Sequence, residues 1–135
     1  ATKEFCLACE TFANPFEKVD EWNVHQIAAH TRDVEKFVYG ERVRKTLHEE
    51  NPQFKSFDAD AWLANEYNKD ESLNKILIDL DASVSDLCNI LKNLKREDWS
   101  RLSSHQSAGN ELTVQVWVER GLAHIEEHLK SLKKR

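Results

Sequence analysis

The segment from Glu71 to Asn93 has the strongest pattern in the chain, because apolar residues recur in it at steps of three and four. Such steps place apolar side chains on one side of an α-helix, so the segment predicts a long helix with one buried face. The spacing resembles the heptad pattern of helices that pack against each other. The stripe consists of Leu73, Ile76, Leu77, Leu80, Val84, Leu87, Cys88, Leu91 and Leu94.

Two other long helices are expected, over Asn23–Glu49 and Leu112–Lys133, and each has an apolar stripe with the same steps. The first stripe consists of Val24, Ile27, Thr31, Val34 and Val38, and the second of Val114, Val118, Leu122, Ile125, Leu129 and Leu132. Gly40 is a weak point of the first helix, where we expect fraying or a bend.

Two shorter helices complete the expected set, over Lys3–Asn14 and within Asp58–Lys69, the latter with Asp58 or Asp60 as its N-cap. No segment alternates convincingly with period two, and the 135 residues include only three Gly and two Pro. This composition argues against a sandwich or barrel of many short strands. The sequence therefore predicts an all-α antiparallel four-helix bundle with one extra short helix, as a single domain over residues 1–135.

The charge balance excludes some partners. The formal net charge is −5, which disfavours sequence-independent binding to nucleic acid because such binding needs clustered Lys and Arg. The basic cluster at residues 130–135 is either a solvated tail or a contact for an anionic partner. No apolar run has the length of a membrane span and no signal-peptide pattern opens the sequence, so a cytoplasmic location is expected.

Three cysteines cannot all pair with one another. Cys6 and Cys9 lie one helical turn apart, but a zinc or redox site would need a second cysteine pair or a different context. We therefore expect both to be buried structural thiols, and Cys88, within the apolar stripe, to pack in the core.

Three histidines lie at the edges of the expected buried faces. His124 and His128 are four residues apart, about 40° from each other on a helical wheel, so that both imidazoles can reach one ion. Gly121 leaves room one turn before them. His30 lies about 60° from the centre of its own stripe. From spacing alone these residues are either metal ligands or ordinary boundary histidines.

The remaining histidines are weaker candidates. His25 falls nearly opposite the apolar stripe of its helix, so we expect it to be solvated. His48 is too far along the helix to reach His30, whereas His105 lies in a loop that could approach the site. Asp33 follows His30 by one turn and could accept a hydrogen bond from a ligand imidazole or approach the ion itself.

Two segments resemble the signature of the DinB-like superfamily, also called the YfiT-like group, over most of the chain from Trp22 to Leu132. The first, EWNVHQIAAHTRD, offers Trp22, Asn23, Val24, His30 and Asp33. The second, DWSRLSSHQSAGNELTVQVWVERGLAHIEEH, offers Trp99, Arg101, Gly109, Leu112, Thr113, His124 and His128.

The resemblance implies that His30, His124 and His128 bind one divalent metal, and that the bundle is of the DinB/YfiT-like type. Imidazole does not select among the transition metals, so zinc, nickel, iron and manganese all remain open. The resemblance also implies an enzyme that activates a small thiol or water, as a thiol S-transferase or a hydrolase. The alternative is a non-catalytic metal-binding stress or interaction protein.

The expected partner is a small-molecule substrate, in some relatives with a low-molecular-weight thiol as co-substrate, and neither nucleic acid nor a membrane. Trp22, Trp117 and the loop 105–109 are expected to line the pocket, and Arg101 or Arg120 to hold an anionic group of the substrate. Aromatic side chains on the short helix, Trp62 and Tyr67, either cap one end of the bundle or form the contact of a homodimer.

Overall fold

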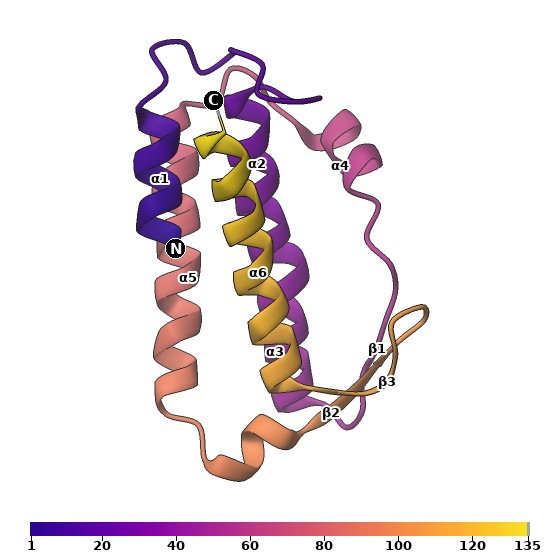
Figure 1. Ribbon diagram of the computed structural model, residues 1–135. Helices are drawn as coiled ribbons and strands as arrows, with labels where there is room; N and C mark the ends of the chain where they lie inside the picture. Colours follow the sequence, from indigo (N-terminus) through magenta and orange to yellow (C-terminus); the bar gives the residue numbers. More distant parts are fainter. Residues whose placement is uncertain (135) are drawn as a thin grey trace.

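The chain folds into a bundle of four helical stretches, with a short helix and a small sheet on its outside (Figure 1). The computed structural model describes residues 1–134. The helices are α1 (Thr2–Glu10), α2 (Val24–Val34), α3 (Gly40–His48), α4 (Ala59–Glu66), α5 (Leu73–Lys92) and α6 (Val114–Lys133), and the strands are β1 (Gln53–Phe54), β2 (Leu102–His105) and β3 (Gly109–Thr113). A π-helical turn, Glu35–Tyr39, joins α2 to α3, and a 3₁₀ helix, Arg96–Ser100, follows α5.

The four stretches run in two directions. In Figure 1, α1 and α6 run upward, whereas the α2–α3 stretch and α5 run downward. The connection that contains β1 and α4 returns along the outside of the bundle, which allows α5 to run parallel to α2. The predicted four-helix bundle with one extra short helix is confirmed. Within the described residues, none of the helices is long and apolar enough to cross a membrane.

Polar side chains fix where the helices begin. Asn23 caps α2 in a reciprocal capping box with Gln26, because each side chain bonds the backbone N–H of the other residue. Asp58 caps α4, Ser72 caps α5 and Thr113 caps α6. The cap of α2 places His30 two turns into that helix, and the cap of α6 places its histidines in the second half.

The expected weak point at Gly40 is the end of the π-helical turn, where the Gly40 N–H bonds the Glu35 carbonyl. A Cβ at Gly40 would lie 2.7 Å from the Glu35 oxygen, so this turn requires a glycine. A π-helical turn inserts one residue into the α-helical period. It therefore rotates the residues after it, and both Glu35 and Tyr39 lie against α6 at Gly121.

The sheet corrects the purely helical prediction. Strand β1 pairs in parallel with β2, and β2 pairs antiparallel with β3. Their lengths of two, four and five residues are too short to give a recognisable period-two pattern. Gly109 is the first residue of β3, directly after the turn from β2, and its φ of 113° is a conformation that favours glycine. The sheet supports the beginning of α6.

The helix stripes form two apolar clusters, with two exceptions. One cluster joins α1, α2, α5 and α6 and the other joins α3, α5, α6 and β3; their largest fully buried members are Phe5, Ile27, Ile76, Leu80 and Trp117. Cys88 is exposed and Leu122 is 50% exposed, so their expected core positions are wrong. Both residues lie beside the first residues of α1, on surfaces that are hollowed among the described residues. Cys9 is buried as expected, and Cys6 is half-buried.

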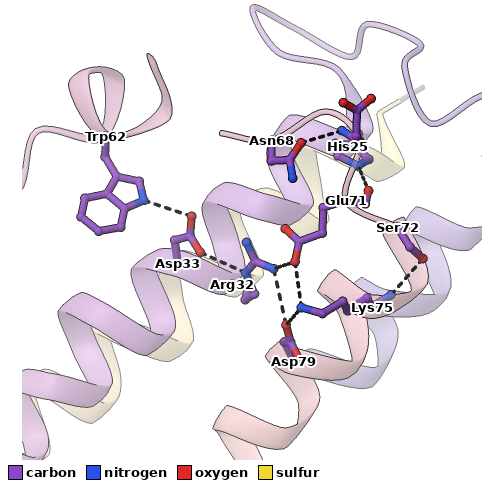
Figure 2. A network of polar contacts seen from close by, with 10 residues as sticks. His25, Arg32, Asp33, Trp62, Asn68, Glu71, Ser72, Lys75 and Asp79 are labelled. Carbon is purple, nitrogen blue, oxygen red and sulfur yellow. Dashed lines mark hydrogen bonds and ion pairs between the residues drawn. The ribbon is translucent and has the colours of Figure 1, made fainter. Parts of the chain in front are cut away.

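A polar network ties α4 and the start of α5 to α2 (Figure 2). The Arg32 guanidinium donates to Glu71 at 2.6 Å and to Asp33 at 3.0 Å. It holds the pKa of the Glu71 carboxyl below its usual range, mainly through this hydrogen bond. The Trp62 indole N–H donates to the second oxygen of Asp33 at 3.0 Å. Trp62 therefore attaches the outer helix to the side of the bundle.

Candidate metal centre

Three imidazoles converge between α2 and α6. The Nε2 atom of His124 lies 3.1 Å from that of His30 and 3.1 Å from that of His128. One ring nitrogen from each of the three lies within 4.8 Å of the others. Two neighbouring helices, and the four-residue spacing on α6, are sufficient to produce this cluster.

The donor set fits a divalent metal better than it fits hydrogen bonding. A neutral imidazole nitrogen either donates one proton or accepts one, so three converging Nε2 atoms cannot all be well satisfied by one another. An ion at about 2.0–2.1 Å from each nitrogen in tetrahedral directions would separate them by about 3.3 Å. The two separations of 3.1 Å are close to that requirement.

Burial keeps these imidazoles in the form that binds metals. It lowers the pKa of His30 to about 4 and that of His124 to about 3, with the neighbouring histidines adding to the effect. The pKa of His128 is also lowered, mainly by burial, while Glu127 and Asp20 act in the opposite direction. Near pH 7 the three rings are therefore neutral, and their nitrogens carry lone pairs that an ion can use.

The three imidazoles differ in exposure, and two aromatic rings border them. His30 is 6% exposed, and the edge of its ring meets the Trp22 indole at 4.7 Å between ring centres. His124 and His128 are half-buried. The Tyr39 ring lies 5.9 Å from the His124 ring. Trp22 and Tyr39 thus border the cluster, next to His30 and His124 respectively.

A buried carboxyl lies one turn away from the cluster. Glu35 is 6% exposed, and a Cβ at Gly121 would lie 3.5 Å from its Oε2 atom and 3.2 Å from the Tyr39 Cβ. Burial raises the pKa of Glu35, and Arg44 acts against this increase. Glu35 and Tyr39, which belong to the π-helical turn, therefore take up part of the room expected at Gly121, and all three residues line a pocket of about 210 Å³.

Other residues that were considered as ligands lie elsewhere. The Asp33 carboxylate bonds Arg32 and Trp62 rather than a ligand imidazole (Figure 2). His105 lies in β2, where its Nδ1 accepts from the backbone of residues 107 and 108. His48 is exposed at the end of α3. None of these three belongs to the cluster of ligand atoms found among the described residues.

The expectation that His25 is solvated is wrong. His25 is 2% exposed, because the segment before α2 and the loop before α5 cover the outer side of α2. Its ring stacks on Phe16 at 5.0 Å between centres. Its Nε2 donates to the Glu71 carbonyl at 2.6 Å, so its Nδ1 accepts from the Tyr67 hydroxyl at 2.6 Å. His25 is a structural residue, and a wheel that considers one helix alone cannot show this.

Several motif residues of the C-terminal half have structural roles. Arg101 donates to the carbonyls of Thr46 at 2.8 Å and Glu49 at 3.0 Å, and so holds the end of α3. Its expected role in binding an anion is therefore not supported. Trp117 is 1% exposed, and its indole N–H donates to Ser103 at 2.7 Å. It lines an apolar pocket of about 210 Å³ together with Glu35, Tyr39 and Gly121, whereas Trp22 packs against the His30 ring.

Comparisons with known proteins agree with this arrangement. The model of the DinB superfamily matches residues 11–132. The chain belongs to the DinB superfamily. No curated protein sequence matches it.

One solved structure supports the same fold of this superfamily. The chain is similar to YfiT from Bacillus subtilis, described as a probable metal-dependent hydrolase with an unusual four-helix bundle topology. The TM-score is 0.78 at 21% identity, and the match covers 99% of this chain and 80% of YfiT. At this identity the likeness shows the fold alone.

Two residues near the cluster were missed from the sequence. Tyr39 and Arg42 lie beyond the π-helical turn, so a regular wheel assigns them to the wrong directions. No signal in the sequence marks that turn except Gly40. The structure places Tyr39 beside His124 and Arg42 over the Tyr39 ring, at 5.8 Å from its centre.

Proposed function

We propose that this protein is a metal-dependent enzyme in which His30, His124 and His128 hold one divalent ion. The convergence of their three ring nitrogens carries the proposal. An ion with three neutral ligands retains a free coordination position and lowers the pKa of water or of a thiol that occupies it. The reaction class is therefore transfer of a small thiol to an electrophile, or hydrolysis.

The protein's own residues supply position and protection. His30 is held at the base of the site by the rigid start of α2 and by the Trp22 ring. His124 and His128 are half-buried, and we expect the ligand to enter beside them. The Tyr39 ring borders this entrance, and its hydroxyl can donate a hydrogen bond to a bound substrate.

The metal remains one of zinc, nickel, iron or manganese, because imidazole binds all four. The likeness to YfiT, a probable metal-dependent hydrolase, favours hydrolysis as one of the two reactions to test. Transfer of a small thiol is the other.

Activity assays on protein loaded separately with each of the four metals test the proposal. One assay follows the loss of cysteine thiol in the presence of an aryl halide, and the other follows hydrolysis of an activated ester. We expect one of them to increase in proportion to bound metal and to fall by about a hundredfold or more in His128→Ala. His48→Ala, an exposed histidine outside the cluster, is the matched control and should keep its activity.

The alternative, a non-catalytic metal-binding protein, gives a different result. In that case metal would bind to the three histidines and stabilise the fold, but neither assay would respond to it. Equal activity in the metal-loaded and metal-depleted protein would contradict the enzyme proposal.

A further inference from the structure

Two arginines stack on one buried indole close to the histidine cluster. The Arg42 Cζ atom lies 4.7 Å from the centre of the Trp117 ring, and the Arg120 Cζ atom lies 5.4 Å from it. Cation–π contacts of this kind hold a guanidinium plane in place while its N–H groups remain available. Arg42 comes from α3 and Arg120 from α6, so packing of the two helices brings the two charges together.

The electrostatic surroundings of this pair are cationic. Burial lowers the pKa of Arg42, the neighbouring Tyr39 acts in the opposite direction, and the Arg120 charge lowers the pKa further. The ring of His105 lies 6.2 Å from that of Trp117. The pKa of His105 is lowered by burial and then by Arg42, a backbone hydrogen bond to Lys55 acts in the opposite direction, and Arg120 lowers the pKa further. Among the described residues, no carboxylate forms an ion pair with either arginine. Like charges gathered without a counter-charge destabilise a fold unless an anion binds there.

The hydrogen-bonding capacity of the pair is largely unused. Arg42 donates one bond, from Nη2 to the Lys55 carbonyl at 3.1 Å. Arg120 makes no hydrogen bond with the described residues, and it is exposed. Each guanidinium has five N–H donors in a planar fork that matches the oxygens of a carboxylate or phosphate.

The pair is also close to the site of the proposed chemistry. Arg120 precedes His124 by four residues on α6, so their side chains are neighbours on one helix face. Arg42 lies over the Tyr39 ring, and that ring lies beside His124. Arg120 is therefore about one helical turn from the histidines, within reach of one small molecule, and Arg42 lies beyond it across the Tyr39 ring.

We propose that Arg42 and Arg120 form a binding subsite for an anionic group, a carboxylate or a phosphate, of the small molecule that reacts at the histidine cluster. That the bound molecule is a substrate rests on the proposed metal-dependent function. That the arginines bind an anion does not depend on this function, and the binding can be measured with or without metal.

The test titrates inorganic phosphate and, separately, butyrate into the protein, both as purified and after dialysis against a chelator. Chemical shifts of the arginine Nε–H and Trp117 indole N–H groups in NMR spectra report binding. We expect saturable binding at millimolar concentrations, about tenfold weaker in Arg120→Gln. Arg42→Lys should also weaken it, because lysine keeps the charge but not the planar fork. Arg96→Gln removes the same charge from an exposed position of the 3₁₀ helix and should bind normally.

Each outcome decides between the proposals. Saturable binding that depends on Arg120 in the chelator-treated protein supports the subsite, even if the protein proves to hold no metal. The tighter of the two probes identifies the anionic group. Equal binding by Arg120→Gln and Arg96→Gln, or no saturation with either probe, overturns the subsite. Binding that disappears with the metal in all variants places the anion on the ion, which overturns the subsite and leaves the metal proposal intact.

Discussion

The Nε2 atoms of His30 and His124 lie 3.1 Å apart across the contact between α2 and α6, although 94 residues separate them in the sequence. This contact, together with His128, is the structural basis of the proposed site. Its geometry depends on features farther along the bundle, including the π-helical turn, the buried Glu35 and the segment that covers His25.

Glu35→Gln is expected to stabilise the protein at neutral pH. Burial raises the pKa of Glu35 in the folded state above its value in the unfolded chain. The protonated carboxyl therefore contributes its full stability at a pH below the unfolded pKa, and this stability is lost as the pH increases through the folded pKa. Glutamine has nearly the same shape and no charge to desolvate. Urea unfolding between pH 4 and about 8 measures this effect. The urea midpoint of the variant should exceed that of the unmodified protein near pH 8, and the two midpoints should agree near pH 4.

Glu41→Gln is the matched control for this experiment. Glu41 is exposed and forms a surface ion pair with Lys45 at 3.6 Å, so its replacement should change the free energy of unfolding by less than about 1 kcal/mol at any pH. If Glu35→Gln is as unstable at neutral pH as a core substitution, the favourable interaction of the Glu35 charge with Arg44 outweighs the effect of burial.

Gly40→Ala is expected to destabilise the protein by about 1–3 kcal/mol, although alanine is normally favoured over glycine inside a helix by about 1 kcal/mol. The reason is the 2.7 Å approach of the new Cβ to the Glu35 carbonyl, which the π-helical turn cannot relieve without changing shape. Thermal unfolding measures the effect. Asn89→Ala, at an exposed position of regular helix in α5, should be neutral or slightly stabilising. An increase in Tm for Gly40→Ala would show that the turn is not required.

His25→Ala is expected to lower the free energy of unfolding by about 3 kcal/mol without removing metal. The substitution deletes a buried ring and leaves both the Tyr67 hydroxyl and the Glu71 carbonyl without their partner. Chemical unfolding and metal analysis of the same sample separate the two effects. A loss of metal with unchanged stability would mean that His25, rather than a member of the cluster, is a ligand.

The helices and the pairing of His124 with His128 could be predicted because both depend on local periodicity. Val24, Ile27 and Thr31 repeat at helical steps and are all fully buried. The i, i+4 spacing of His124 and His128 places both rings on one face of any helix that contains them. The position of His30 beside them required the resemblance, since spacing on one helix cannot show which faces meet.

The remaining features depend on contacts that are distant in sequence. His25 is buried by segments on either side of α2, and Arg101 is occupied by the carbonyls at the end of α3. The direction of Arg42 depends on one inserted residue in the π-helical turn. The three strands are too short for periodicity, and only their pairing makes them recognisable.

The most direct test of the central claim is the metal content of protein purified without an affinity tag or chelator, measured by elemental analysis. The account predicts about one transition-metal ion per chain, lost in His30→Ala and in the His124→Ala/His128→Ala double variant, and retained in His48→Ala. Circular dichroism should show that each variant keeps its helices. If the unmodified chain contains no metal and takes up none from a micromolar excess, the three histidines are not a metal site and the proposed enzyme mechanism is wrong.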